Sequence, residues 1–466
     1  MKKRVSIIKF VVYLAVLVMG GVLFYLYMTA PKHGVESGPF YIKVDGVVEP
    51  STASIRRSGD VYTFTSNVHG PVIVEKDNVV VDGAGFTVQG SGVNGSKGVY
   101  LSGRKNVTLR NMGVTGFWYG VCLANSSGIS VLGTNVTENV MYGVWLNEYS
   151  SRNIVSWNGI AVNGHGICVE YCSENVFSGN SIVDNGFGVY LYYSSNNSFS
   201  GNNVTANGSY GFWLHESSNF NSISGNSIVE NGVGIYFLRL SEFNSISGNN
   251  ITANERQGIW LHQSSNNILS GNSIVSNRYG LYLSLGFIGG SSDNLVYHNN
   301  FVGNVDQVFI ENATGTHEPP PPPVNVWDNG FEGNFWSEYV DVDKNRDGIG
   351  DSPYLVTSLK VTQYDHYPLM GSFYGLNVSG YDVAVVSNST IEGFDFFKSN
   401  STIKIFVSKM AVNQTFGFCR IRVPHSLVNE TFNVDVEGAE TYYVNYALHD
   451  DGENRWVYVS YQHWSL

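Results

Sequence analysis

The chain has 466 residues and 43% of them are hydrophobic, which is enough apolar material for a large core and for more than one domain. Its formal net charge is −12, and several of its few cations lie at the extreme N-terminus. This balance argues against nucleic acid as a partner, because phosphate binding requires a basic surface that the body of the chain lacks.

Residues 1–36 combine a basic start with a long apolar segment. Lys and Arg residues within positions 2–9 precede an uncharged stretch from Phe10 to Thr29, which as a helix can span about 30 Å of hydrocarbon. Basic residues before such a segment favour a cytoplasmic N-terminus, so the rest of the chain is expected outside. A cleaved signal peptide is the alternative, although Met28 and Ala30 form a poor cleavage pair. We predict a cytoplasmic stub and a single-pass membrane anchor of an extracellular protein.

A short motif then repeats through the middle of the chain, after three strand-like segments at 61–65, 72–74 and 78–85. Each copy reads Gly, an aliphatic residue or Phe, then Tyr, Trp or Cys, then an aliphatic residue or Phe, and copies are 22 to 24 residues apart. The copies begin at Gly98, Gly120, Gly143, Gly166, Gly188, Gly211, Gly234, Gly258 and Gly280. Units this short, β-branched and rich in Gly, Asn and Ser predict a right-handed parallel β-helix over residues 37–310.

Turn residues recur within each unit at fixed offsets from the motif. One column contains Asn185, Asn207, Asn231, Asn254 and Asn277. Stacked coils would place one amide above the next, where side-chain amides can hydrogen-bond along the stack. We predict a structural role for these residues. Some tetrapeptides also recur every 46 residues, which indicates a duplicated pair of coils.

The segment 311–375 is predicted to be a proline loop and a cap on the open end of the solenoid. Glu318 is followed by five prolines, which cannot pair in a sheet. Further on, the spacing from Asp343 follows the oxygen-ligand pattern of a calcium loop, with Gly348 at the sharp turn, although Tyr354 replaces the final glutamate. We predict structural calcium here, with a metal-free acidic turn as the alternative. The candidate ligands are Asp341, Asp343, Asn345, Asp347 and Asp351.

Residues 376–466 show alternating apolar strands with turn signals about every ten residues, which predicts a small β-sandwich. From Asn377 onward, five of eight asparagines lie in Asn-x-Ser/Thr sequons, as in a glycoprotein of an outer surface.

The segments 60–65, 80–85, 333–339 and 347–354, together with the coils, resemble NosD-type β-helix proteins of the pectin-lyase-like superfamily. The tail, at 416–421 and 423–427, is similar to a module found in archaeal surface proteins. The resemblance implies the fold across most of 40–369. The family name refers to a periplasmic protein needed for maturing the copper site of nitrous oxide reductase, but a match within scaffold repeats does not transfer that role.

The third position of each motif faces outward, because side chains alternate along a strand. It forms an aromatic ladder, interrupted by Cys122 and Cys168, that we predict to bind glycan, since sugar C–H faces stack on aromatic rings. The alternative is that these rings stack on each other or are covered by another segment. The ladder residues are Tyr100, Trp145, Tyr190, Trp213, Tyr236, Trp260 and Tyr282.

Signals for catalysis are weak. The Gly-His-Gly at His165 lacks the paired aspartates of polygalacturonase-like relatives. Acids at Glu138, Asp184 and Glu230 share one coil position, but neighbours are two coils apart, which is too far for a retaining pair and near the limit for an inverting one. A polysaccharide lyase, hydrolase or epimerase therefore remains an alternative function.

Metal and disulfide chemistry on the coils is disfavoured by the same spacing. His215 and His262 are two coils apart, which forbids a shared ion and makes copper an unfavoured cofactor. Cys122 and Cys168 would be about 9.6 Å apart, beyond the reach of a disulfide. The leading hypothesis is a membrane-anchored extracellular β-helix that binds glycan or another surface polymer. A structural envelope protein or a copper-site accessory is a further alternative.

Overall fold

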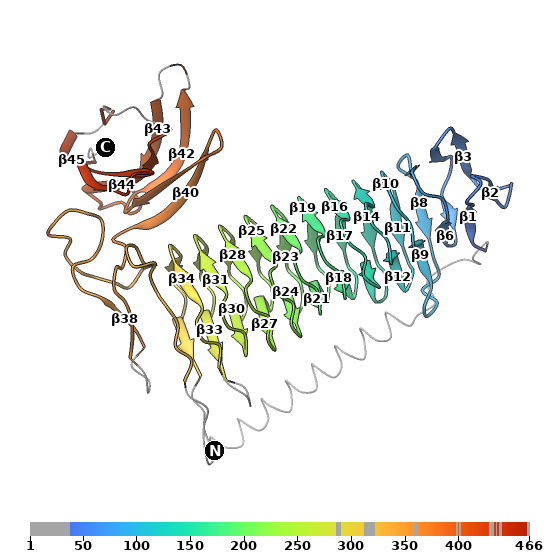
Figure 1. Ribbon diagram of the computed structural model, residues 1–466, viewed down its shortest axis with the longest axis horizontal. Helices are drawn as coiled ribbons and strands as arrows, with labels where there is room; N and C mark the ends of the chain where they lie inside the picture. Colours follow the sequence, from blue (N-terminus) through green and yellow to red (C-terminus); the bar gives the residue numbers. More distant parts are fainter. Residues whose placement is uncertain are drawn as a thin grey trace, which may run out of the picture. The chain divides into compact units, whose positions relative to one another are not determined.

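The computed structural model describes residues 38–285, 290–311, 322–357, 362–397, 399, 402–427, 433–434, 436–437 and 440–463. These residues form β-strands and the loops that join them (Figure 1). The predicted membrane anchor and most of the predicted proline loop lie outside the described residues. Within the described part, no helix is long and apolar enough to cross a membrane.

The chain divides into two compact units. The described part of unit 1 comprises 38–176 and 180–186, and unit 2 comprises 177–179 and the chain from 187 onward, so that the division crosses β19 (Val176–Ser178). Each unit contains a stack of coils, and each coil contributes one short strand to each of three parallel sheets, which we name A, B and C. The predicted parallel β-helix is therefore confirmed.

Unit 1 begins with short strands before its regular coils. Those early strands are β1 (Phe40–Ile42), β2 (Val48–Glu49) and β3 (Ile55–Ser58). Sheet A contains β6 (Val72–Val74), β9 (Lys97–Ser102), β12 (Tyr119–Ala124), β15 (Tyr142–Asn147) and β18 (His165–Glu170). Sheet B contains β4 (Val61–Phe64), β7 (Val79–Asp82), β10 (Val107–Arg110), β13 (Ser130–Leu132) and β16 (Ile154–Ser156). Sheet C contains β5 (Val68–His69), β8 (Thr87–Gln89), β11 (Gly113–Thr115), β14 (Asn135–Thr137), β17 (Gly159–Ala161) and β20 (Ser181–Val183).

The coils of unit 2 follow the same plan. Sheet A contains β21 (Phe187–Tyr192), β24 (Tyr210–His215), β27 (Val233–Leu238), β30 (Gln257–His262), β33 (Tyr279–Ser284) and β36 (Asp306–Ile310). Sheet B contains β22 (Ser198–Ser200), β25 (Ser222–Ser224), β28 (Ser245–Ser247), β31 (Ile268–Ser270) and β34 (Leu295–Tyr297). Sheet C contains β23 (Asn203–Thr205), β26 (Ser227–Val229), β29 (Asn250–Thr252), β32 (Ser273–Val275), β35 (Asn300–Val302) and β37 (Phe335–Trp336).

The core of each stack is a set of aligned inward side chains. In unit 2, Phe212 pairs with Ile235 and Ile235 with Ile259 in the parallel register of sheet A, and all three are 0% exposed. Burying each such side chain contributes about 1.5–3 kcal/mol. The motif glycines lie beside this core because a Cβ at Gly234 would approach the Gly258 carbonyl oxygen to 2.4 Å.

The predicted asparagine column is confirmed as a hydrogen-bonded asparagine ladder inside each stack. In unit 2, the backbone nitrogen and Nδ2 of Asn231 both donate to Oδ1 of Asn254, at 3.0 and 3.1 Å. Asn254 bonds in the same way to Asn277, and the amide of Asn231 also donates to the Val204 carbonyl. Two further corners carry equivalent ladders, one of which contains Asn226. Each amide therefore satisfies buried backbone groups at a turn.

The end of the solenoid in unit 2 is closed by large aromatic side chains. Trp336 stacks on Phe301 of the last coil at 4.5 Å and donates its indole hydrogen to Asp365 at 2.9 Å. The hairpin of β38 (Tyr354–Thr357) and β39 (Gln363–Asp365) supplies that carboxylate. Burial raises the pKa of Asp365 to about 6, despite the hydrogen bonds that it accepts.

A five-stranded antiparallel sheet follows the cap, in the order β40-β41-β44-β46-β45, and the hairpin of β42 and β43 packs on it through Val385, Ile391 and Ile405. The alternating apolar segments predicted for residues 376–466 include 383–386, 403–407, 416–421 and 456–459, which lie within β41, β43, β44 and β46. The strands are β40 (Ser372–Val378), β41 (Tyr381–Ser387), β42 (Thr390–Phe397), β43 (Thr402–Ser408), β44 (Phe416–Pro424), β45 (Glu440–Asp450) and β46 (Asn454–Gln462).

A buried carboxylate joins the last coil, the cap and this sheet. Glu332 of the cap accepts hydrogen bonds from His298 at 2.8 Å, Arg420 at 2.7 Å and Trp456 at 3.0 Å. Burial alone would raise the pKa of Glu332, but the bond from His298 and the charge of Arg420 outweigh it and lower the pKa to about 2. The ion network therefore depends on an ionised Glu332.

Candidate functional site

The structure aligns the predicted aromatic ladder within each unit. In unit 1, Cys122 pairs with Tyr100 on one side and Trp145 on the other, and Trp145 pairs with Cys168. In unit 2 the ladder runs in register through Tyr190, Trp213, Tyr236, Trp260 and Tyr282, and continues to Phe309. The regular register follows from the near-constant length of the coils.

The exposure of the ladder differs from the expectation at three positions. Cys122 and Cys168 are 0% exposed and Tyr236 is 7% exposed, although the column was expected to face solvent throughout. The physical reason is the size and proximity of neighbouring rings. Tyr119 and Trp145, which flank Cys122, have ring centroids 4.5 Å apart, and Tyr236 stacks on Trp260 at 4.2 Å.

Two further columns of rings flank the ladder, and they were not predicted from the sequence. Phe187, Tyr210 and Tyr279 precede the motif glycine, while Tyr192 and His215 lie two positions beyond the ladder residue. Extending the alternation by two positions beyond the ladder residue finds Tyr192 and His215, whereas Phe187, Tyr210 and Tyr279 lie three positions before it and depart from the alternation. We call the outward side chains of β21, β24, β27, β30 and β33 the aromatic face.

Trp213 lies at the centre of the aromatic face and contacts rings on all sides. Its ring centroid is 4.7 Å from Tyr190, 5.3 Å from Tyr210, 5.6 Å from Phe187 and 5.1 Å from His215. Such contacts hold the rings as a platform with few accessible rotamers, so a ligand that stacks on it would lose little side-chain entropy.

Polar atoms on the aromatic face differ in how far they are satisfied. The indole nitrogen of Trp260 donates to the Ser284 hydroxyl at 2.8 Å. The indole nitrogen of Trp213 and the side-chain oxygen of Gln257 are shielded from solvent and have no hydrogen-bond partner among the described residues. Nε2 of His215 is likewise shielded and lies 3.4 Å from Oε1 of Glu216, and a buried polar atom without a partner costs about 1–3 kcal/mol.

The imidazoles of the face are neutral at physiological pH. Burial lowers the pKa of His215, an effect that Arg239 adds to and that Glu216 opposes. Burial also lowers the pKa of His262. Leu238 lies between the two histidines in the register, so they do not share a site. The aromatic face thus presents little charge of its own.

The acids and the Gly-His-Gly motif of unit 1 do not converge on a catalytic site. The turn bonds from Glu138 to Ala161 and from Val162 to Val183 place Val162 between Glu138 and Asp184. Burial lowers the pKa of His165 to about 4, and its ring meets Tyr142 edge-on at 5.2 Å. The predicted two-coil separation of the acids is therefore confirmed.

The predicted calcium ligands form a compact turn in the cap. Asp343 accepts backbone hydrogen bonds from Asp347 and Gly348, both at 2.9 Å, and the Asn345 amide donates to Asp347 at 3.0 Å. Asp341 accepts from Ser352 at 2.7 Å, while Asp351 accepts from Lys344 at 3.3 Å. Burial raises the pKa of Asp343, so a bound cation would stabilise its ionised form. Calcium stays a prediction.

These features define a class, a parallel β-helix with aromatic side chains concentrated on one of its three sheets. The family described as "Periplasmic copper-binding protein (NosD)" matches residues 72–246 and 238–340, which is more than half of the chain. The protein belongs to this NosD family.

Two relatives are each named "Probable ABC transporter binding protein NosD". The protein from Stutzerimonas stutzeri is 35% identical over 88 residues, covering 19% of this chain and 17% of the relative. The protein from Pseudomonas aeruginosa is 34% identical over 88 residues, covering 19% of this chain and 18% of the relative. The match spans less than a fifth of the length of these curated relatives.

The solved structures that match include an alginate epimerase and a tailspike protein. The periplasmic alginate epimerase AlgG has a TM-score of 0.41 at 17% identity, covering 62% of this chain and 76% of its own. The Dettilon tailspike protein has a TM-score of 0.38 at 13% identity, covering 84% of this chain and 88% of its own. These values describe likeness of fold alone.

The described residues do not fit the copper that the family description names. All four cysteines are buried, and burial raises the pKa of Cys122 and Cys172 to about 12, which disfavours the thiolate form that binds metal. Burial also raises the pKa of Cys168 and Cys419. Among the described residues, which include the acidic turn of the cap, no three or more His, Cys, Asp or Glu side chains are grouped closely enough in this structure to hold an ion.

Proposed function

We propose that this protein binds a polysaccharide along the outward side of sheet A. The observation that carries the proposal is the contrast among the three sheets of unit 2. Each coil supplies one strand to every sheet. The outward positions of sheet A carry Trp213 and Trp260, whereas the outward positions of sheet B carry serines such as Ser222 and Ser245. If rings were present merely because they favour strands, sheets B and C would carry them too.

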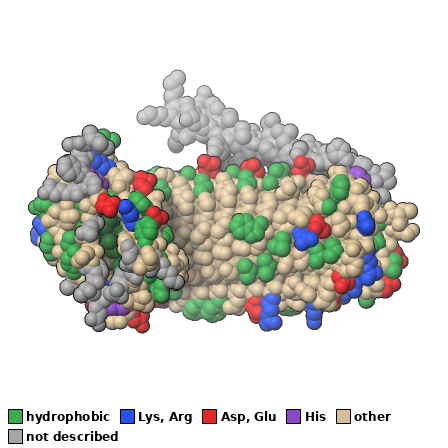
Figure 2. Space-filling model, turned by 90° about the horizontal axis from the view of Figure 1, so that it is seen from above, with side chains coloured by type: hydrophobic (Ala, Val, Ile, Leu, Met, Phe, Trp, Pro, Cys, Tyr) green, Lys and Arg blue, Asp and Glu red, His purple; other side chains and the backbone are tan. Residues whose placement is uncertain are grey.

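The view of the coils from the side of the sheet B strands supports this contrast. Figure 2 shows a surface made largely of backbone and uncharged polar side chains, with separate groups of hydrophobic and charged side chains among them. Sheet C likewise presents Asn203, Thr205, Asn250 and Thr252 outward. The concentration of rings on one side of a repeated structure is typical of a binding surface.

The chemistry of the aromatic face suits an uncharged sugar polymer. Half-buried rings such as Tyr190 and Trp260 can stack on the C–H faces of sugar rings. Neutral His215 and His262 add no charge that such a ligand would have to neutralise.

The proposal includes a position outside the cytoplasmic membrane. The family description is periplasmic, and residues 10–29 have the composition of a membrane anchor. In this proposal the anchor holds the β-helix at the outer side of the membrane, and the C-terminal strands form a small sandwich module.

Binding rather than catalysis is the activity proposed, because a coil separates Glu138 from Asp184. An enzyme of the lyase, hydrolase or epimerase kind would release or alter product in the same assay.

A polysaccharide array tests the proposal. The wild-type protein is expected to retain one or more polysaccharides, and the Trp213→Ala/Trp260→Ala variant is expected to bind at least about tenfold more weakly, which is about 1.4 kcal/mol. The matched control is Phe220→Ala/Phe243→Ala, which removes a stacked pair that lies outside sheet A, 57% and 48% exposed. Equal loss in both variants, or none in the first, would refute the aromatic face. Product detected by mass spectrometry would favour the enzyme.

A further inference from the structure

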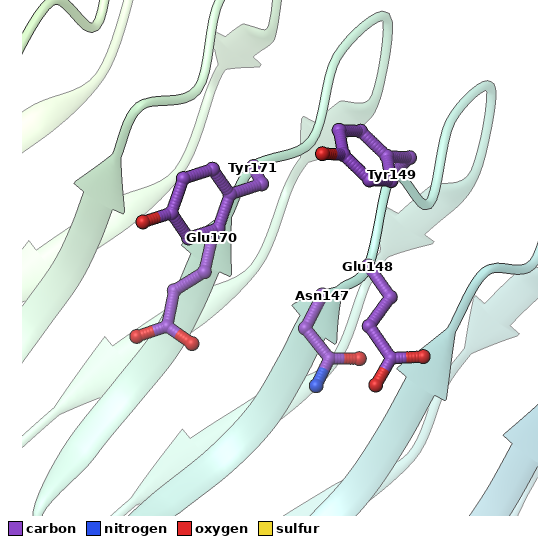
Figure 3. A pocket seen from close by; sticks show the side chains of 5 residues that line it. All are labelled: Asn147, Glu148, Tyr149, Glu170 and Tyr171. Atoms are coloured by element: carbon purple, nitrogen blue, oxygen red, sulfur yellow. The ribbon is translucent and has the colours of Figure 1, made fainter.

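A shallow pocket opens in unit 1 beside the aromatic ladder. It has a volume of about 270 Å³ and is lined by Asn147, Glu148 and Tyr149 from the end of β15 and by Glu170 and Tyr171 from the end of β18 (Figure 3). The tyrosine rings lie on one side of the pocket, and the carboxylates and the amide lie on the other. The pocket therefore joins two aromatic surfaces to a set of polar groups.

The two tyrosine rings are held out from the coil by the backbone. Tyr149 and Tyr171 have φ angles of 64° and 53°, and they are 79% and 47% exposed. The Tyr149 nitrogen donates to the Tyr171 carbonyl at 3.1 Å, which fixes the rings on adjacent coils. Bulky residues ordinarily avoid positive φ. These turns adopt it nevertheless, and they hold the two aromatic rings in solvent.

The polar side of the pocket consists mainly of acceptors. Glu170 accepts a hydrogen bond from the Trp145 indole at 2.8 Å, and its carboxylate also interacts with the Cys168 thiol. The side-chain oxygen of Asn147 is shielded and has no hydrogen-bond partner among the described residues. Glu148 is exposed at the rim. The five lining residues include no cation, and the neighbouring Arg152 is paired with Glu174 at 2.7 Å.

We propose that this pocket binds the ammonium group of an amino sugar within the glycan, an inference that rests on the proposed function. Two carboxylates can accept the hydrogens of an ammonium group, and two tyrosine faces can attract its charge. The bond from Trp145 to Glu170 connects the pocket with the aromatic ladder, so one polymer can contact both. The pocket would select a glycan that carries free amines.

Short glucosamine oligomers test the proposal against N-acetylglucosamine oligomers of the same length. The two share a backbone and differ in charge, because acetylation removes the ammonium group. At pH 6, the wild-type protein is expected to bind the free amine form at least about tenfold more tightly. The Glu148→Gln/Glu170→Gln variant is expected to bind both forms alike. Equal binding by the wild type, or no binding, would overturn the proposal.

Two control variants separate the pocket from general attraction to an acidic protein. Glu138→Gln removes an exposed acid elsewhere in unit 1 and is expected to keep the preference. Tyr149→Asn/Tyr171→Asn is expected to reduce it, since Asn tolerates positive φ and the backbone is preserved. A preference that survives this change would mean that charge alone attracts the amine, and the pocket would be refuted.

The same oligomers distinguish failure of the pocket from failure of the aromatic face. If Trp213→Ala/Trp260→Ala weakens both oligomers and leaves the preference intact, both proposals stand. If the tryptophan variant leaves the affinity for both oligomers unchanged while the glutamate variant abolishes the preference for the free amine, the pocket proposal is supported and the aromatic-face proposal is refuted. If the preference is absent while the tryptophan variant still weakens binding, the pocket alone falls.

Discussion

Sheets A and B of unit 2 are built from the same coils and differ on their outward sides. Both place an aliphatic or aromatic side chain inward, such as Ile235 in β27 and Ile246 in β28, each 0% exposed. Outward, β27 presents Tyr236 where β28 presents Ser245 and Ser247. The comparison teaches that the coil requires its inward residues and its asparagine corners, but does not require rings outside.

The largest expected effect comes from the scaffold that both sheets share. In Asn226→Ala, the backbone nitrogen and the amide of Asn202, which bond to Asn226 at 2.9 Å, would lose their acceptor. We expect about 3 kcal/mol of destabilisation in urea unfolding, because these groups stay buried. Ser224→Ala, on the outward side of sheet B, is the control and is expected to change stability by less than about 0.5 kcal/mol. Similar values for both variants would remove the distinction between scaffold and surface.

Acid is expected to weaken the ion and hydrogen-bond network around Glu332 without affecting the outward residues of sheets A and B. The folded-state pKa of Glu332 is lowered to about 2, so its contribution is complete above the unfolded pKa near 4.5 and is lost as pH falls toward 2. The loss is on the order of 3 kcal/mol. Asp365, with its pKa raised to about 6, acts oppositely and reduces stability as pH rises from about 4 to 6. Urea unfolding at several pH values measures both.

Glu332→Gln provides the control for the acid limb. It removes the titrating group that faces His298 and Arg420, so the stability difference between wild type and variant is expected to shrink as pH falls from 4.5 to 2. A constant difference across that range would show that Glu332 does not titrate with a lowered pKa.

Replacing the outward tryptophans of sheet A by serine, the residue that sheet B carries outward, tests whether the rings stabilise the coils. We expect Trp213→Ser/Trp260→Ser to lower the free energy of unfolding by less than about 2 kcal/mol, because both rings are half-buried and lie outside the core. Circular dichroism and urea titration measure the change. Unfolding of this variant would mean that the rings are part of the scaffold.

The smallest expected effect is calcium removal. A clamp in the range of extracellular calcium modules would contribute about 1 kcal/mol at millimolar calcium. A chelator is therefore expected to lower the melting temperature, and Asp343→Asn is expected to abolish the response. A melting temperature indifferent to chelator would remove the calcium prediction.

The sequence predicts the features that the repeat controls. Because coil length is nearly constant, it correctly aligned Tyr190 with Trp213 and Asn231 with Asn254. The sequence did not predict that the neighbouring rings of Tyr119 and Trp145 cover Cys122, which is therefore buried although it lies in an outward column.

Contacts outside the repeat period could not be read from the sequence. Glu332 meets Arg420 and Trp456 across 88 and 124 positions, and no spacing rule links them. The pocket of unit 1 depends on tyrosines at positive φ, a conformation that the turn imposes against residue preference. The inner and periodic parts were thus predictable, whereas the irregular ones required the structure.

A crystal structure of the protein with an oligosaccharide of the polysaccharide retained on the array tests the central claim most directly. We predict sugar density stacked on the outward rings of β21 to β33. Sugar bound over the outward serines of sheet B, with the rings of sheet A left uncovered, would contradict it.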